Sequence, residues 1–283
     1  MSQQPPDPRD FTARRAIVTG ASSGIGQATA IELARGGMDV GIAYHENADG
    51  IAETKAAIEG LGRRAFVAQS DLADLAGVRI VDELAAELGG LDVFVANAGI
   101  GDPYTVEEID VDAWMRVMNV NLNSAVLCMQ KAARIMIDQG TGGRIVAVSS
   151  VHDSEPNPMS IAYGASKYGL RGAVETMAQR LTHLYGITAN CVGPGEVATP
   201  INDMGPEEAD RTKTPRPALP GGRPGHPEEI AHAIAFVASA RASYMTGSTL
   251  YIDGGMRASA ALSLQPHRVA WLDATGKGET IET

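Results

Sequence analysis

Tyr163 and Lys167 stand four residues apart in an alanine- and glycine-rich segment. If this segment is helical, residues at i and i+4 lie side by side, so a phenol and an ammonium meet. A free tyrosine has a pKa near ~10 and exchanges protons poorly at neutral pH. A neighbouring cation favours the phenolate and brings that pKa toward the working range. The spacing also occurs on solvated helix faces, but Ser150, at the end of an apolar run, adds a hydroxyl and favours acid–base chemistry.

A glycine-rich turn runs from Thr19 to Gly26, between the first predicted strand and the first predicted helix. Glycines at Gly20, Gly24 and Gly26 permit a sharp turn and let backbone N–H groups approach a pyrophosphate. The helix N-terminus adds a positive dipole there. A purely structural turn is the alternative, but strand, spacing and helix together favour a dinucleotide site.

The end of the second predicted strand bears on the choice of dinucleotide. A carboxylate about 20 residues beyond the turn usually holds the adenosine ribose of NAD(H). This chain has Tyr44, His45 and Glu46 there, and neither an aspartate, an arginine nor a lysine at the strand end. Ser23 and His45 can hydrogen-bond a 2′-phosphate, whereas Glu46 would oppose one if it points inward. The sequence therefore favours NADP(H) slightly over NAD(H).

Apolar runs of strand length alternate with helical periodicity along the chain. Strands are predicted at 15–19, 39–44, 65–69, 93–96, 144–149, 188–192 and 249–252. Helices are predicted at 25–35, 48–61, 75–88, 112–139, 162–184 and 227–239. Helical connections of this length impose right-handed crossovers, so we expect an α/β fold with a doubly wound parallel sheet covered on both faces.

The predicted organisation is one domain with appended segments. Residues 1–12 are predicted to form a flexible N-terminal segment, 13–257 the α/β domain and 258–283 a C-terminal extension. Within the domain, 199–227 is rich in proline and glycine and too long for an ordinary connection, which predicts a substrate lid. A disordered insertion is the alternative reading. The C-terminal extension contains apolar residues that would dock on a neighbouring subunit or on its own.

Composition excludes several classes of protein. A net charge of -11 and a pI near 5.0 argue against nucleic-acid binding. No apolar run reaches membrane-spanning length, and the polar, proline-rich start is unlike a signal peptide. Cys128 and Cys191 lie in apolar segments without a CxxC spacing, which indicates buried thiols in a reducing, cytoplasmic compartment. No metal site is expected, because no cluster has ligand spacing.

Taken together, the motifs resemble the short-chain dehydrogenase/reductase family over residues 15–256. They are the glycine turn, Asn97-Ala98-Gly99, Ser150 and the Tyr163/Lys167 pair, with further matches at Asp71, Asn121, Pro194-Gly195 and Asp253-Gly254-Gly255. The resemblance implies a seven-stranded Rossmann sheet of order 3-2-1-4-5-6-7. It also implies a homotetramer and an NAD(P)-dependent enzyme that interconverts an alcohol and a carbonyl of a small-molecule substrate.

The resemblance also implies four catalytic residues. Tyr163 would be the general acid/base, and Lys167 would lower its pKa and bind the nicotinamide ribose. Ser150 would hold the substrate oxygen and stabilise developing charge. Asn121 would interrupt its helix and hold a water that links Lys167 to solvent. A solvent-facing helix residue is the alternative, but the position of Asn121 between two apolar residues favours a buried functional role.

The cofactor residues follow from the same resemblance. Asp71 would accept from the adenine amino group, and Val197 and Thr199 would contact the nicotinamide carboxamide. The full expected set is Gly20, Ser22, Ser23, Gly24, Ile25, Gly26, Tyr44, His45, Asp71, Leu72, Asn97, Ala98, Gly99, Tyr163, Lys167, Pro194, Gly195, Val197 and Thr199.

The loop from Ser149 to Asp153, followed by Pro156 and Pro158, resembles the glucose 1-dehydrogenase branch. A sugar or polyol is thus the first expectation for the substrate, held by Ser150, Tyr163 and His152, although a histidine in this loop more often bonds the backbone.

Two alternatives remain. One is a 3-oxoacyl thioester or general carbonyl reductase; Arg211, Lys213, Arg216 and Arg223 on the predicted lid would suit an acyl-carrier substrate. The other is a cofactor-sensing protein without turnover, which would need neither the upstream serine nor the tyrosine–lysine pair.

Overall fold

The computed structural model describes residues 6–259 apart from 102 and 218. Expectations that concern residues 1–5 and 260–283 therefore lie outside the described residues, including most of the predicted C-terminal extension.

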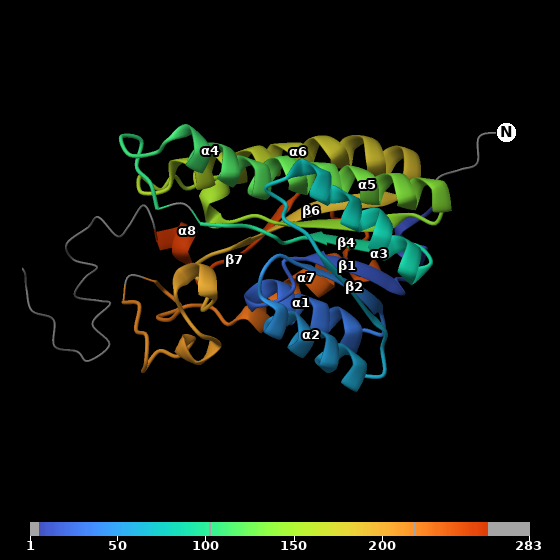
Figure 1. Cartoon of the computed structure of the whole chain (residues 1–283), viewed down its shortest axis with the longest axis horizontal. Helices are drawn as coiled ribbons and strands as arrows, with labels where there is room; N and C mark the ends of the chain where they lie inside the picture. Colours follow the sequence, from blue (N-terminus) through green and yellow to red (C-terminus); the bar gives the residue numbers. More distant parts are fainter. Residues whose placement is uncertain (1–5, 102, 218, 260–283) are drawn as a thin grey trace, which may run out of the picture.

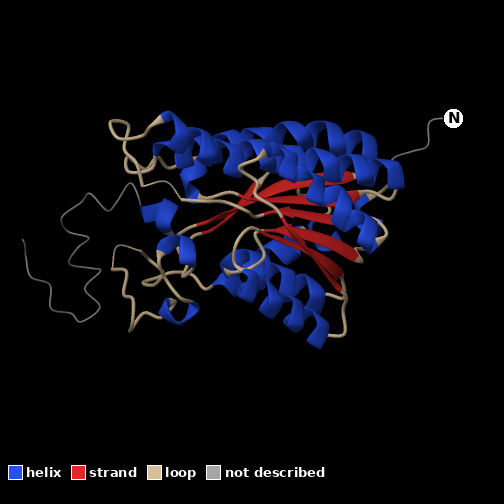
Figure 2. Cartoon of the chain, viewed as in Figure 1, coloured by secondary structure: helices blue, strands red, loops and turns tan. Residues whose placement is uncertain are grey.

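One seven-stranded parallel sheet forms the centre of the molecule, with strand order β3-β2-β1-β4-β5-β6-β7 (Figure 2). Its strands are β1 (Arg15–Thr19), β2 (Asp39–Tyr44), β3 (Ala65–Gln69), β4 (Val93–Ala96), β5 (Gly143–Val148), β6 (Ile187–Pro194) and β7 (Thr249–Ile252). This result confirms the predicted fold and strand order. Strands β1, β2, β3, β4 and β7 have the predicted bounds, and β5 and β6 differ by one or two residues at their ends.

Helices cover both faces of the sheet (Figure 1). One layer holds α1 (Gly24–Arg35), α2 (Ala48–Gly60) and α7 (Pro227–Val237); the other holds α3 (Ile80–Leu88), α5 (Ser124–Gln139) and α6 (Ile161–Tyr185). The shorter α4 (Val111–Met118) precedes α5, and α8 (Met256–Ser259) follows β7.

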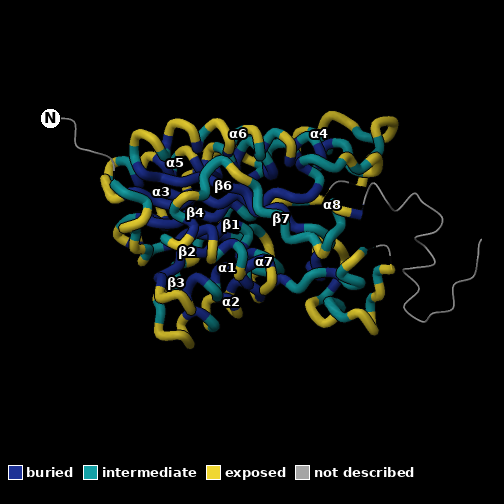
Figure 3. The backbone as a smooth tube through the Cα atoms, turned by 180° about the vertical axis from the view of Figure 1, so that it is seen from behind, coloured by how far each residue is buried: buried dark blue, intermediate teal, exposed yellow. Residues whose placement is uncertain are grey.

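Two apolar cores, one on each face, hold the layers together (Figure 3). Strands β1, β4, β5 and β6 are almost entirely buried, because both of their faces are covered. Phe94 and Ile145 fill the core under α3, α5 and α6, whereas Val18 and Val146 face α1 and α7. Burial of such side chains stabilises the fold by about 1.5–3 kcal/mol each, and it fixes the strand ends that carry the motifs.

The long helix predicted at 112–139 is divided, as the family resemblance implied for Asn121. A π-helical turn at Asn119–Asn123 separates α4 from α5. The predicted helix at 75–88 also begins differently, with a 3₁₀ turn at Leu75–Arg79 before α3. Hydrophobic periodicity did not resolve either local change in helix type, since both keep the apolar side chains toward the core.

Residues 6–12, which fall in the segment expected to be flexible, contact the end of the molecule where the strands begin. Arg144 of β5 is fully buried and donates a 2.6 Å hydrogen bond to the carbonyl of Pro8. Its guanidinium lies 4.1 Å from the centroid of the Phe11 ring. Burial lowers the pKa of Arg144 to about 10. This arginine therefore fastens the N-terminal segment to the sheet.

The described residues of the segment 199–227 lie at the opposite end of the molecule, below β7 and α8 in Figure 1. Paired charges hold the segment. Arg216 Nη2 donates to Glu196 Oε1 at 2.6 Å, and Arg223 Nη2 donates to Glu229 Oε1 at 2.7 Å. The segment contains 3₁₀ turns at Pro200–Asn202 and Pro206–Glu208. A β-bridge from Val197 to Gly225 joins its two ends.

Candidate active site

The strand ends and the first residues of the 199–227 segment, Thr199 to Asn202, line a cavity of about 1060 Å³. Every predicted cofactor and substrate residue lines this cavity, as do the predicted catalytic residues Ser150, Tyr163 and Lys167. Asn121 is the exception: it is 1% exposed and lies behind the cavity wall. Residues separated by more than 170 positions in the sequence thus meet at one site, as expected for the carboxyl ends of a parallel sheet.

The glycine turn has the geometry that close approach to a phosphate requires. Gly20 and Gly24 have φ of +65° and +54°, values that disfavour residues with side chains. A Cβ on Gly26 would lie 2.1 Å from the carbonyl oxygen of Gly20. Among the described residues, no side-chain hydrogen bond from Ser23 caps the start of α1. The N–H groups of the first helical turn are therefore available to an anion. The turn fits the pyrophosphate of a dinucleotide.

Asn97 joins the turn to the end of β4. Its Nδ2 donates to the carbonyl oxygens of Thr19 at 2.9 Å and Gly20 at 3.1 Å. In return, the Thr19 hydroxyl accepts from the backbone N–H groups of Asn97 and Ala98. These four bonds hold two neighbouring strand ends rigid beside the cavity.

At the adenosine end, His45 lies between two carboxylates. Its Nδ1 is 3.5 Å from Glu46 Oε1, and its Nε2 is 3.7 Å from Asp71 Oδ2. Asp71 also accepts a 2.8 Å hydrogen bond from the N–H of Ala73, which orients its carboxylate. This end of the cavity therefore carries negative charge around a single histidine.

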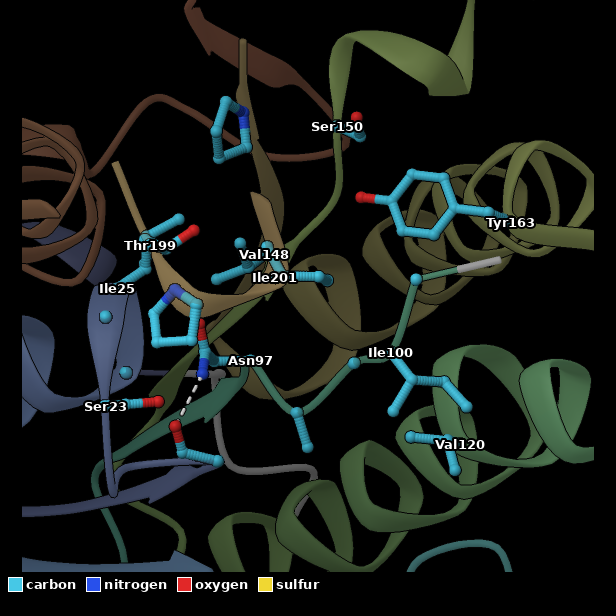
Figure 4. A pocket seen from close by; sticks show the side chains of 18 of the residues that line it. Ser23, Ile25, Asn97, Ile100, Val120, Val148, Ser150, Tyr163, Thr199 and Ile201 are labelled. Carbon is cyan, nitrogen blue, oxygen red and sulfur yellow. Dashed lines mark hydrogen bonds between the residues drawn. The ribbon is translucent and has the colours of Figure 1, made fainter. Parts of the chain in front are cut away.

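At the other end of the cavity, Ser150 and Tyr163 face the same space (Figure 4). Ser150 follows β5 and is 6% exposed, while Tyr163 stands in the first turn of α6. A side-chain hydrogen bond connects the two hydroxyls. Ser23 of the glycine turn lies across the cavity from them (Figure 4). A substrate oxygen placed beside both hydroxyls would thus face the site that the turn provides for a dinucleotide.

Lys167 lies one turn along α6, as predicted, with its Nζ 5.5 Å from the centroid of the Tyr163 ring. It is 4% exposed and donates a 2.9 Å hydrogen bond to the carbonyl of Val148. Burial lowers the pKa of Lys167 to about 8.

The pKa of Tyr163 lies above its ordinary value in this structure, and its lowering by Lys167 stays a prediction. Burial raises the pKa of Tyr163, because it disfavours the phenolate more than the hydrogen bond from Ser150 favours it. Asp153 raises that pKa further. The sequence identified the cation, Lys167, but it did not indicate that the Tyr163 side chain is buried.

Asn121 braces the loop after β4 from within the π-helical turn. Its Oδ1 accepts from the N–H of Ile100 at 2.9 Å, and its Nδ2 donates to the carbonyl of the same residue at 3.0 Å. The Nδ2 also lies 3.3 Å from the hydroxyl of Ser166, the residue before Lys167. Asn121 therefore connects the cavity wall to the helix that carries Tyr163 and Lys167.

The substrate end contains residues that the motifs did not predict. Apolar side chains and additional polar groups line it: Ile100, Pro103, Asn157, Ser160, Ile201 and Met256. Asn157 and Ser160 precede Tyr163 in one loop, a proximity that was visible in the sequence. Ile201 and Met256 come from distant segments, and each lies in a stretch, Pro200-Ile201-Asn202 or Asp253-Gly254-Gly255-Met256, that resembles the glucose 1-dehydrogenase branch.

Within the described residues, no helix is long and apolar enough to cross a membrane. The same residues contain no group of three or more histidines, cysteines or carboxylates placed to hold a metal ion.

Comparisons with known proteins agree with this geometry. The family model described as "Enoyl-(Acyl carrier protein) reductase" matches residues 20–257. A cis-4-hydroxycyclohexanecarboxylate dehydrogenase of Sinomonas cyclohexanicum is 40% identical over 250 residues, or 88% of this chain and 98% of the relative. Glucose 1-dehydrogenase 2 of Bacillus subtilis (strain 168) is 36% identical over 250 residues, or 88% and 96%. The crystal structure of acetoin dehydrogenase from Enterobacter cloacae aligns with a TM-score of 0.83 at 39% identity, covering 89% of this chain and 99% of that one.

Both the family match and these relatives span nearly the whole described domain, and the relatives are dehydrogenases of alcohols. The phosphate turn, the paired hydroxyls and the buried lysine provide the matching chemistry on this sheet. This chain therefore belongs to the short-chain dehydrogenase/reductase family and is an NAD(P)-dependent oxidoreductase that interconverts an alcohol and a carbonyl.

Proposed function

We propose that the substrate is a small secondary alcohol with a second oxygen-bearing group next to the reacting carbon, such as a hydroxy ketone, a polyol or a sugar. One observation carries this proposal: the hydroxyls of Ser150 and Tyr163 lie beside His152 in the same cavity as the phosphate turn. The relatives named for acetoin and glucose fit this description, because both compounds carry an oxygen function on the carbon next to the reacting one. The 4-hydroxycyclohexanecarboxylate of a third relative carries its second oxygen function across the ring instead.

In the proposed mechanism, Tyr163 takes the proton of the substrate hydroxyl during oxidation and returns it during reduction. Ser150 donates a hydrogen bond to the substrate oxygen and stabilises the charge that develops on it. Lys167 holds a positive charge near the phenolate. The bound dinucleotide supplies the hydride acceptor or donor. Asn121 holds the wall at Ile100 and the helix that carries Tyr163 in a fixed relation.

His152 is the proposed partner of the second substrate oxygen. Its Nδ1 lies 2.8 Å from the carbonyl of Glu155, an acceptor, so Nδ1 carries the proton and Nε2 can accept a hydrogen bond. The imidazole stands edge-on to the Tyr163 ring, 6.2 Å between centroids. A hydroxyl on the carbon adjacent to the reacting centre would reach this acceptor. The hydrogen bond from His152 Nδ1 to the carbonyl of Glu155 does not exclude substrate binding, because it leaves Nε2 for the substrate.

The thioester alternative is less well supported, because it relies on free cations around the site. Arg216 is engaged by Glu196 and Arg223 by Glu229, while Arg211 donates to the carbonyl of Gly221 at 2.8 Å. An acidic carrier would have to compete with these bonds.

For the cofactor, we propose NAD(H), against the slight sequence-based preference for NADP(H). A 2′-phosphate near His45 would face the carboxylates of Glu46 and Asp71 at the adenosine end. Of the described lining residues only Arg116 and Lys167 are lysine or arginine, and Lys167 lies at the catalytic end. A ribose hydroxyl, by contrast, can donate to either carboxylate.

We further propose that 199–227 acts as a substrate lid within a catalytic domain of residues 13–257, and that the enzyme is a cytoplasmic homotetramer. Large apolar side chains that remain exposed on α4, α5, α6 and α7 support subunit contacts: Val111, Met115, Leu127, Tyr168 and Phe236. Light scattering of the purified protein tests the assembly, and a monomer at micromolar concentration would contradict it. Cell fractionation tests the location.

A substrate panel tests the function. Acetoin, 2,3-butanediol, glucose, simple secondary alcohols and a 3-oxoacyl thioester are assayed with both dinucleotides. We expect turnover of the vicinal hydroxylated compounds, with a higher kcat/KM than for alcohols of equal length that lack the second oxygen. A His152→Ala variant should abolish that difference. Turnover of thioesters alone would overturn the proposal.

A further inference from the structure

A buried carboxylate lies directly behind the catalytic hydroxyls. Asp153 belongs to the 3₁₀ turn Val151–Asp153, which follows Ser150, and its exposed fraction is 0%. It is not part of the described cavity lining, so it does not reach the substrate. Its Oδ2 accepts a 2.8 Å hydrogen bond from the hydroxyl of Ser149, and its Oδ1 accepts a 2.5 Å hydrogen bond from the hydroxyl of Tyr251 on β7. Arg171 Nη1 of α6 lies 3.7 Å from the same Oδ1.

These contacts fix the turn that presents Ser150. The N–H of Asp153 donates to the carbonyl of Ser150 at 3.1 Å, and the N–H of His152 lies 3.1 Å from the Ser150 hydroxyl oxygen. The turn is thus bonded to the strand before it, while the Asp153 carboxylate attaches it to β7 and α6. A displacement of Asp153 would move Ser150 and His152 together.

The charge of Asp153 also acts on the proton-exchanging groups. It raises the pKa of Tyr163 in addition to the larger effect of burial, and it opposes the effect of burial on Lys167. Several groups surround this carboxylate: Ser149 and His152 on the same segment, Lys167, Arg171 and Glu175 on α6, Cys191 on β6 and Tyr251 on β7. Arg171 is the cation paired with Asp153, and its side chain is 33% exposed.

We propose that Asp153 is a positioning residue of the active site: its buried carboxylate holds the Ser150 turn against β7 and α6, and its charge, partly balanced by Arg171, acts on the proton exchange of Tyr163. This inference rests on the proposed role of Tyr163 as the general base.

The pH dependence of kcat/KM for alcohol oxidation tests the electrostatic part. Oxidation needs the phenolate of Tyr163, so activity rises with pH through the midpoint of the Tyr163 titration. In Asp153→Asn a negative charge that opposes the phenolate is lost, and we expect the midpoint to move to lower pH. In Arg171→Gln the balancing cation is lost, and we expect the midpoint to move to higher pH. Opposite shifts from two touching residues separate an effect of charge from general damage to the fold.

Two control variants separate positioning from charge. Tyr251→Phe removes one hydrogen bond to Asp153 and keeps the charge, so kcat should fall roughly three- to tenfold while the midpoint stays in place. Asp92→Asn removes another buried carboxylate, which pairs with Arg15 where β1 and β4 begin, and it should leave both kcat and the midpoint unchanged.

The outcomes distinguish this inference from the role of Tyr163. Ultraviolet titration of tyrosinate, taken as the difference between wild type and Tyr163→Phe, reports the midpoint of Tyr163 without turnover. If that midpoint differs from the kinetic one, the role of Tyr163 fails. If the two agree but Asp153→Asn leaves them in place or moves them upward, the inference about Asp153 fails. Should Asp153→Asn not fold, Arg171→Gln decides alone, and an unchanged or lowered midpoint overturns the inference.

Discussion

The ammonium of Lys167 lies 5.5 Å from the centroid of the Tyr163 ring and is held there by a 2.9 Å hydrogen bond to the carbonyl of Val148. Strand β5 therefore sets the distance between the cation and the phenol, and the helix spacing alone does not. The same strand ends next to Ser150, so one element positions two members of the catalytic set.

Replacement of Tyr163 by phenylalanine should remove the proton-exchanging group and little else. We expect kcat to fall by roughly 10²–10⁴, the usual contribution of general acid–base catalysis, with nearly unchanged cofactor affinity in a nicotinamide fluorescence titration. Tyr244→Phe, which alters an exposed tyrosine outside the cavity lining, is the matched control and should keep full activity. Residual activity of Tyr163→Phe within about tenfold of wild type would refute the role.

Lys167→Met should give a more stable but inactive protein. The pKa of Lys167 falls from 10.5 to about 8 on burial, so its charged form costs about 3 kcal/mol of folding free energy below pH 8. Loss of the bond to Val148 offsets about 1–1.5 kcal/mol of the gain. We therefore expect the free energy of unfolding at pH 7 to rise by about 1–2 kcal/mol, measured by urea denaturation.

The pH dependence of that gain has a fixed sign. The unfolded chain binds the proton of Lys167 more tightly than the folded one, so the stability of the wild type rises between pH 8 and 10.5, and the advantage of the variant disappears there. Lys131→Met, at a surface lysine paired with Asp82, serves as control and should not stabilise. A variant at Lys167 that is less stable than wild type at pH 7 would contradict the account.

Gly26→Ala should damage the phosphate turn. Its Cβ would lie 2.1 Å from the Gly20 carbonyl oxygen and 2.4 Å from Asn97 Nδ2, so the turn has to move. We expect the free energy of unfolding to fall by about 1–3 kcal/mol and the Kd for the dinucleotide to rise. Gly172→Ala, in α6 with nothing within 4 Å of the added Cβ, should instead stabilise by about 0.5–1 kcal/mol. Equal effects of the two substitutions would show that the turn tolerates a side chain.

His45→Arg should improve binding of NADP(H). A guanidinium can bond a 2′-phosphate bidentately, and it adds positive charge between Glu46 and Asp71. We expect the Kd for NADP(H) to fall about tenfold while that for NAD(H) changes little, as measured by fluorescence titration. His232→Arg, the same substitution at an exposed site on α7, is the control. A wild type that already binds NADP(H) more tightly would contradict the proposed preference.

The sequence predicted most of the fold because its signals were local. The strand at 15–19, the glycine turn and the helix after it follow one another directly, and short apolar runs bounded by turns identified the remaining strands. All of the predicted cofactor and substrate residues line the cavity for the same reason, since most of the motifs follow the end of a strand. The resemblance to a family then supplied the order of the strands.

What the sequence did not reveal depends on contacts between distant residues. The hydrogen bond from Tyr251 to Asp153 joins positions 98 apart, and no pattern marks either residue as a partner. The raised pKa of Tyr163 likewise comes from burial, which is a property of the assembled site. Hydrophobic periodicity did not mark the π-helical turn, because the apolar side chains around it still face the core; only the family resemblance implied an interruption at Asn121.

That turn has a consequence for how the chain can vary in length. A π turn contains one residue more than the α-helical turn it replaces, and each residue of an α-helix advances by about 100°. Deletion of a single residue at 119–123 would therefore rotate α4 by roughly a quarter turn relative to α5 and pull Asn121 away from Ile100. Insertions and deletions in related enzymes should consequently avoid this helix and collect in the segment between Met204 and Arg223.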